Sequence, residues 1–468
     1  MMKLLKMAPF ILLTGCAAVG PDWEAPTAEL ENTFVSGEGS SINDVAYQAW
    51  WREFTDPTLT ALVEKGFEQN LSILQAKERI REANALLRET GINSALDGSL
   101  SYNRLRAGGE NVSTSTSSSA SLDAEFVIDL FGGIRREQEA AQSYLAATQA
   151  DIGTERLAWL AELIEKYADA RYYQKAAQLT AATINTRQDT LAITQKQLDN
   201  GLSTQYELAE IKASLQTAQA DLPGYQAQYQ AAIFALATLM DEPAKQILAM
   251  MSSSTDQLTL PTTIATGIPA DLLRNRPDIR YYEAVLHQQV AKTGVEESDL
   301  YPSIRLTGSV SHANSADGWS FGPSISLGLF NRGLLKAQRD AQISAANQAE
   351  IDWRSSVLDA VEDVQVAQSN FTLYMQQSDL LKQAAESYST ALELGHNNFK
   401  NGAMTLLDLL DTVRSEASTQ ISAASARNTA LQEWTALQIA IGAGAGFADV
   451  DQDQDQDQEQ ANKSPLDS

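Results

Sequence analysis

The chain has 468 residues, a formal net charge of −26 and only 7% aromatic residues. So strong a negative charge argues against nucleic acid as a partner, because the phosphates would be repelled. Few aromatic residues, together with abundant Ala, Gln, Ser and Thr, fit long and thin packed helices better than one thick core.

The N-terminus has the features of a secretory signal peptide. Lys3 and Lys6 precede or border an apolar run at residues 7–13, and such peptides place their charged part before their apolar part. The run ends in the tetrapeptide LTGC at residues 13–16, which resembles a bacterial lipobox. The alternative interpretation is a plain secretory peptide with a chance cysteine.

The lipobox resemblance implies that Cys16 is acylated, with residues 1–15 as the signal peptide and residues 16–46 as a lipid-anchored linker. Cys16 is the only cysteine, so no disulfide is possible within the chain. Ala17 follows it, and by the same resemblance the lack of aspartate there favours the outer membrane. No run of about 18 apolar residues occurs after the signal peptide, so any later membrane crossing would be made by strands.

Residues 47–90 are predicted to be helical, with a brief break at Asn70-Leu71. Asp56 is a possible N-cap, because Pro57 follows at a favourable first helical position. The segment thus predicts two consecutive helices ahead of the first strands.

Residues 94–106 and 117–130 are predicted to be β-strands. Between residues 120 and 130 the apolar side chains occupy alternate positions, with polar side chains between them. A period of two gives one apolar face and one polar face. The Gly/Ser/Thr-rich residues 107–118 are predicted to form the loop of the hairpin.

A very long helix is predicted to follow these strands. After Phe131, helix-forming residues dominate and no proline appears until Pro223. The expected helix has about 65 residues, or about 100 Å at ~1.5 Å per residue. Asn200-Gly201 is the predicted turn, and a return helix is expected from Thr204, interrupted by Pro223.

The same plan recurs in the second half of the chain. Arg276-Pro277 opens a helix, residues 303–312 and 319–330 alternate as strands, and residues 314–318 are the expected loop. A second long helix is then expected, which turns at Asn401-Gly402, 201 residues after the first such turn. This internal repeat is the main organisational signal of the sequence.

The repeat divides the chain into segments. Residues 47–243 form the first repeat, 244–266 a linker, 267–448 the second repeat and 449–468 a tail. The tail holds seven acidic residues and one lysine, a composition typical of disordered segments.

Four strands of this length suit a bilayer, since about 9–11 tilted residues cross one. Four strands do not close a barrel, and open sheet edges are not tolerated in lipid, so the strands predict an oligomer. The alternative is a water-soluble hairpin in each half.

Short motifs span nearly the whole chain in a fixed order: Cys16 with Val19-Gly20-Pro21-Asp22, then residues 51–57, 129–132, 272–279, 301–304, 329–331 and 407–411. Together they resemble the outer-membrane factor family of TolC-like efflux and export ducts, and within it the OprM-type lipoproteins. Asn275, where arginine is common, the GAGAG segment at residues 442–446 and the acidic tail depart from the family pattern.

The resemblance implies an α+β fold: a homotrimer in which four strands per chain build a twelve-stranded transmembrane barrel, continuous with a long periplasmic helical barrel. It implies an exit duct that takes small molecules or drugs from a periplasmic adaptor and an inner-membrane RND transporter to the exterior. The turns at Asn200-Gly201 and Asn401-Gly402 would then dock with the adaptor or pump. The alternatives are a type I protein-secretion duct and a non-conducting structural envelope lipoprotein.

One polar group near the second turn is a candidate gate. Asp408, Asp411 and Arg414 share a helix face through their three-residue spacing, and Glu207 and Glu210 occupy the matching offsets in the first half. On the residues alone, the favoured interpretation is a solvated helix face with an intrahelical Asp411–Arg414 ion pair. The family resemblance implies instead that Asp408, Asp411 and Arg414 close the periplasmic entrance, and the internal repeat extends the role to the two glutamates.

Nothing in the sequence indicates catalysis. His287, His312 and His396 share no metal-ligand spacing, and no metalloprotease, nucleophile-elbow or P-loop motif occurs. The sequence therefore predicts no enzymatic activity, no cofactor and no metal site.

Overall fold

The computed structural model describes residues 18–35, 40–42, 45–252, 256–261, 266–313 and 316–447. Cys16, the signal peptide and the tail at 449–468 lie outside these ranges. The chain forms two compact units. The strand unit contains residues 18–29, Ala76–Ile152 and the described part of Asp278–Val357, and the helical unit contains the other described residues. Each unit draws segments from both halves of the sequence, so the sequence repeats are not separate compact units.

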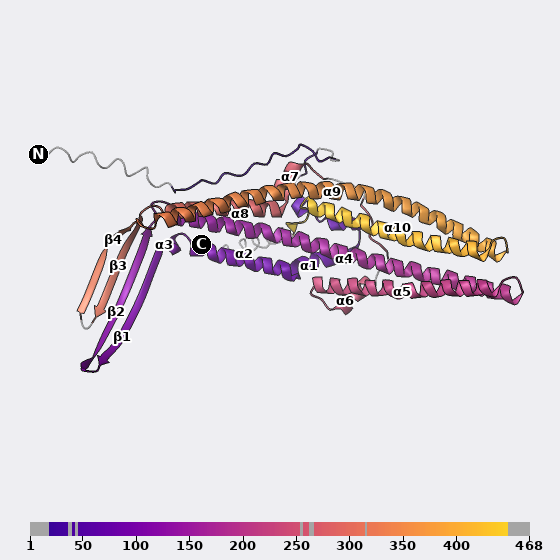
Figure 1. Ribbon diagram of the computed structural model, residues 1–468, viewed down its shortest axis with the longest axis horizontal. Helices are drawn as coiled ribbons and strands as arrows, with labels where there is room; N and C mark the ends of the chain where they lie inside the picture. Colours follow the sequence, from indigo (N-terminus) through magenta and orange to yellow (C-terminus); the bar gives the residue numbers. More distant parts are fainter. Residues whose placement is uncertain are drawn as a thin grey trace, which may run out of the picture. The chain divides into compact units, whose positions relative to one another are not determined.

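The strand unit contains one four-stranded antiparallel sheet (Figure 1). Its strands are β1 (Leu96–Gly109), β2 (Val112–Ile128), β3 (Ser303–Ala313) and β4 (Ala316–Ser326), paired in that order. The alternation of apolar residues thus identified all four strands, although not all of their ends. Within the described residues, β1 and β4 each pair on one side only, which leaves two free sheet edges.

The predicted loop at residues 107–118 is wrong. The strands continue through most of this segment, with Ala107 opposite Ser115, and the turn lies at Glu110 and Asn111, where Asn111 has a φ of 71°. Serine and threonine dominate both turns and polar strands, and threonine is a favourable strand residue. The expected loop at 314–318 is likewise too long, because β4 already begins at Ala316, and β4 ends at Ser326 rather than at residue 330.

Two helices are far longer than those of ordinary domains. Helix α4 (Gly133–Asp199) has 67 residues and α9 (Arg332–Lys400) has 69, close to the expected length. Each is followed by a return helix of 35 residues, α5 (Gln205–Leu239) and α10 (Leu406–Ala440). Pro223 does not interrupt α5 as predicted: it lies inside the helix on an exposed position, where only one backbone bond is lost.

Shorter helices complete the described chain: η1 (Val45–Tyr47), η2 (Trp50–Phe54), α1 (Pro57–Gln69), α2 (Leu71–Glu89), α3 (Ile92–Ala95), α6 (Ala244–Met251), α7 (Pro269–Asn275) and α8 (Pro277–Ser298). Asp56 caps α1 as predicted, since its side chain accepts bonds from the amides of Thr58 and Leu59. Helix α6 lies in the segment expected to be a linker. None of the described helices is long and apolar enough to span a membrane.

The core of the helical unit is an aromatic cluster. Trp50 lies 5.4 Å from Trp434, Phe54 lies 5.1 Å from Trp434, and Phe67 lies 5.2 Å from Trp159, measured between ring centroids. These rings belong to η2, α1, α4 and α10, and edge-to-face contacts of this kind add to the area that they bury. The cluster therefore holds the short N-terminal helices against both long hairpins.

Residues 18–23, here called the N-terminal strap, run along the strand unit. The Val19 amide donates to the Phe131 carbonyl at 2.9 Å, and Trp23 stacks on His287 with ring centroids 4.4 Å apart. Gly20 has a φ of 87°, and a Cβ there would lie 2.5 Å from the Cα of Gly294. Only glycine allows so close an approach in that conformation, so the strap is fitted to its path.

Candidate functional site

The two hairpin turns share one geometry. Gly201 and Gly402 have φ values of 70° and 75°. After each glycine the next amide reaches back across the helix end: Leu202 donates to the Gln197 carbonyl, and Ala403 to the Asn398 carbonyl, both at 2.8 Å. This is the glycine-dependent helix termination that Asn-Gly predicted.

Each return helix begins with a threonine cap and an acidic residue three positions later. Thr204 accepts a bond from the Glu207 amide, and the Glu207 carboxylate accepts bonds from the Thr204 amide and the Ser203 hydroxyl. Thr405 accepts from the Asp408 amide at 3.2 Å and donates to the Asp408 carboxylate at 2.6 Å. Two of the residues predicted to form a gate, Glu207 and Asp408, thus take part in local helix capping.

The capping bonds lower the pKa of Glu207. The hydrogen bond from the Ser203 hydroxyl contributes most, followed by those from the backbone and side chain of Thr204. Since these donors favour the charged carboxylate, Glu207 carries a negative charge beside its turn at neutral pH.

Asp411 and Arg414 form an ion pair on α10. Their side chains are 62% and 75% exposed, and Asp408 is exposed as well. In one chain the predicted face therefore points to solvent, where such a pair contributes about 0.3–0.5 kcal/mol. Glu210 is partly exposed on α5. The predicted gate residues of the second half lie on α10, and those of the first half lie on α5. No hydrogen bond or ion pair between these two groups is observed in the described residues.

The opposite face of α10 carries an apolar cluster that the sequence analysis missed. Leu406, Leu409 and Val413 are buried against Phe399 of α9 and Ile211 of α5. We call these five residues the apolar tip cluster; it joins the two hairpins close to their turns. The signal was present in the sequence, since residues spaced 3 and 4 apart form one helix stripe.

Arg187, a residue of α4 whose side chain contacts α5, was also missed. Its guanidinium donates to the Ser214 carbonyl at 2.5 Å. Burial lowers its pKa, against the attraction of Asp221. A partly buried cation held by a carbonyl links the two arms of the first hairpin.

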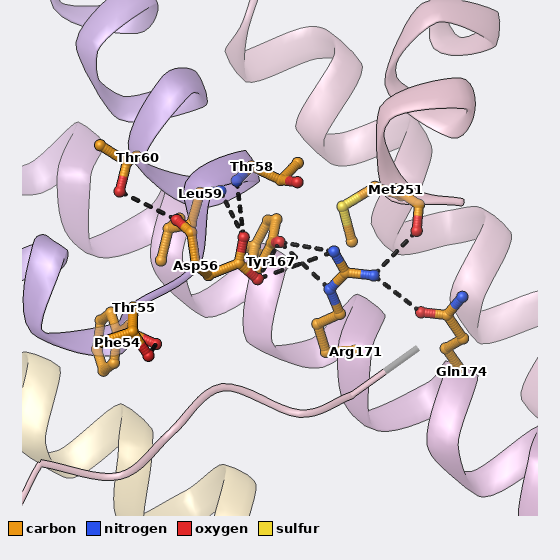
Figure 2. Close-up of polar contacts among 10 residues, drawn as sticks. All are labelled: Phe54, Thr55, Asp56, Thr58, Leu59, Thr60, Tyr167, Arg171, Gln174 and Met251. Atoms are coloured by element: carbon orange, nitrogen blue, oxygen red, sulfur yellow. Dashed lines mark hydrogen bonds and ion pairs between the residues drawn. The ribbon is translucent and has the colours of Figure 1, made fainter. Parts of the chain in front are cut away.

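Figure 2 shows a buried network around Arg171 in the helical unit. The Arg171 side chain donates to the Tyr167 hydroxyl at 2.8 Å and to the Met251 carbonyl at 2.9 Å. The Tyr167 hydroxyl donates to Asp56 at 2.7 Å, the same carboxylate that caps α1. Burial raises the pKa of Tyr167 above its ordinary value. We call this the Arg171 network; it ties α1, α4 and the end of α6 together.

The three histidines lie in different surroundings. His287 is bonded to Glu139 at 3.0 Å and His312 to Asp317 at 2.6 Å, while the Nδ1 atom of His396 has no hydrogen-bond partner. In the described ranges, no three His, Cys, Asp or Glu side chains come together as a metal site.

Comparisons with known proteins agree with one another. The family model described as outer membrane efflux protein matches residues 62–241 and 268–443. Nodulation protein T of Rhizobium leguminosarum bv. trifolii is 34% identical over 454 residues, covering 92% of this chain and 95% of that protein. The pyoverdine export outer membrane protein OpmQ of Pseudomonas putida is 29% identical, covering 90% and 91%. The solved outer-membrane channel OprN has a TM-score of 0.81 at 26% identity, covering 91% of this chain and 99% of that one.

Proposed function

The chain belongs to the outer membrane efflux protein family, and from this membership we propose that it works as the homotrimeric exit duct of a tripartite pump. As an efflux channel it resides in the outer membrane with a large periplasmic portion. The family match covers both halves of the chain, and this observation carries the proposal.

The proposed trimer completes the sheet. β1 and β4 leave free edges, and several strand residues expose large apolar side chains, among them Leu100, Trp319 and Phe321. Three chains with four strands each would give a twelve-stranded barrel, in which every edge is paired and the apolar side chains meet lipid. The parallel order of elements in the two halves supports the proposal of an internal repeat.

The proposed partners follow from the same architecture. The turns at Asn200-Gly201 and Asn401-Gly402 would meet a periplasmic adaptor, with an inner-membrane RND transporter supplying the energy, and acylated Cys16 would add a lipid anchor. One relative is named for pyoverdine export, which supports small molecules as the transported class. We propose no catalysis and no cofactor for this duct.

Asp408, Asp411 and Arg414 are proposed as its periplasmic gate, assisted by Glu207 and Glu210. Asp408, Asp411 and Arg414 are exposed in one chain, so their side chains are accessible to neighbouring copies. Charge-assisted bonds that become partly buried are worth about 1.5–3 kcal/mol each, and three-fold symmetry would repeat each one.

The test is the conductance of the full-length protein in planar bilayers. Replacing Asp408, Asp411 and Arg414 together with alanine should raise conductance several-fold, because the closed state loses these bonds in every copy. The matched control replaces Glu78 and Arg81, another exposed ion pair at the same spacing, and should leave conductance unchanged.

Two outcomes would contradict the proposal in different places. Unchanged conductance in the triple variant would make the three residues an ordinary solvated helix face. The absence of any conductance in both the unmutated protein and the triple variant would favour a non-conducting envelope lipoprotein.

A further inference from the structure

One aromatic contact closes the base of the β2–β3 pair. Phe131, between β2 and α4, stacks on Tyr301, between α8 and β3, with ring centroids 4.7 Å apart and planes inclined by 22°. The two strands pair down to this level, where Ile128 lies opposite Ile304. The stacked rings therefore join two strand–helix junctions that belong to different halves of the sequence.

The second half has the same junction without the same contact. Phe330 lies two residues before α9, just as Phe131 lies two residues before α4, and each follows a leucine. Phe131 is packed, whereas Phe330 is fully exposed and Leu329 is 65% exposed. Burying one phenylalanine removes roughly 150–250 Å² from water, so an exposed pair at this position indicates a missing partner.

The complementary junction lies at the other edge of the sheet. β1 is entered from α3, as β3 is entered from α8. At this entrance Ile92 is 74% exposed and Leu96 is 60% exposed. One sheet edge thus ends in an exposed aromatic residue, and the other begins with exposed aliphatic residues.

We propose that Phe330 of one copy packs against Ile92 and Leu96 of a neighbouring copy, in the way that Phe131 packs on Tyr301 within the chain. The occupant is a second copy of this chain, because β4 beside the next copy's β1 continues the β2–β3 arrangement. The inference rests on the proposed trimer and identifies the residues of its junction seam, defined as Phe330 with Ile92 and Leu96.

Cross-linking tests the seam in the full-length protein. Cys16→Ser first removes the only native cysteine. Phe330→Cys is then combined with Ile92→Cys or with Leu96→Cys, and a short bismaleimide is added to membranes. At least one pair should give covalently linked dimers and trimers on a denaturing gel. The matched control combines Phe330→Cys with Val112→Cys and should give no linked species. Val112 is an exposed aliphatic residue at the start of β2, at the end of the sheet remote from the helix junctions.

A second measurement distinguishes an effect on trimer stability from an effect on the stability of the single chain. Phe330→Ala should lower the temperature at which the trimer dissociates in mild detergent while leaving helix content unchanged. Phe330→Leu should recover part of the loss. Phe131→Ala should instead lower the unfolding temperature of the protomer, because its ring already packs within the chain.

The mass of the protein under non-denaturing conditions distinguishes failure of the seam from failure of the proposed trimer. A trimeric protein with no cross-link in either pair would overturn the seam and leave the trimer standing. A monomeric protein in mild detergent and in membranes would overturn the proposed assembly, and the seam with it.

Discussion

Arg171 makes structural contacts that no local sequence pattern predicts. Its side chain is fully buried on α4, yet it serves α1 through Tyr167 and Asp56 and serves α6 through the Met251 carbonyl. Tyr167 and Asp56 are 111 residues apart, so no local pattern joins them. The capping role of Asp56 was predictable from Pro57 beside it, whereas its second role was not.

Arg171→Leu should destabilise the protein strongly. The change leaves the Met251 carbonyl and one acceptor site of Tyr167 without their donor in a buried place, and such losses cost on the order of 3 kcal/mol. Thermal unfolding of the purified protein in detergent would measure it. The control Arg81→Leu alters an exposed arginine and should change stability by less than about 1 kcal/mol. Equal effects of the two variants would contradict a structural role for the Arg171 network.

At the scale of elements, the two longest helices were predicted well and the ends of the strands poorly. Proline-free stretches that end in Asn-Gly predicted α4 and α9 together with their turns, because glycine there adopts a positive φ. The β1–β2 turn was misplaced, because the Ser/Thr-rich strand ends resemble a loop in composition. The apolar tip cluster was missed because its partners come from three helices.

The N-terminal strap is bound to α4 mainly through the charged side chain of Arg136. Arg136 donates to the Asp22 carboxylate at 2.6 Å, to the Glu139 carboxylate at 2.7 Å and to the Val19 carbonyl at 3.2 Å. Glu139 in turn bonds His287, on which Trp23 stacks. Burial alone would raise the pKa of Glu139, but the bonds from Arg136 and His287 outweigh it and lower that pKa below its usual value.

Because the pKa of Glu139 is lowered in the folded protein, we expect acid to loosen the N-terminal strap. Because the folded pKa of Glu139 is depressed, its stabilisation is complete above the ordinary pKa of 4.5 and is lost as the pH falls through the lower folded value. Hydrogen exchange of residues 18–23 should therefore accelerate, after correction for intrinsic rates, below about pH 4.5. Glu139→Gln should show fast exchange already at pH 7, with little further change in acid. A strap that stays protected in both proteins would contradict the prediction.

At the scale of the whole molecule, the observed position of the β1–β2 turn shows where a tag can test the orientation of the proposed barrel in the membrane. In the proposed trimer this turn lies at the exterior end of the barrel, and the α4–α5 turn lies in the periplasm. An epitope tag inserted between Glu110 and Asn111 should be detected by antibody on intact cells. The same tag between Gly201 and Leu202 should be detected only after the outer membrane is permeabilised. The reverse pattern would invert the orientation.

The free edges of β1 and β4 have a consequence for how this protein must be measured. In the proposed trimer other copies complete the sheet, so its folding equilibrium should depend on protein concentration. The sheet should melt at a higher temperature in concentrated samples than in dilute ones. Before the copies meet, each exposed edge is also a template for indiscriminate pairing. Safe passage to the membrane therefore requires either rapid encounter between copies or an escort that covers the edges.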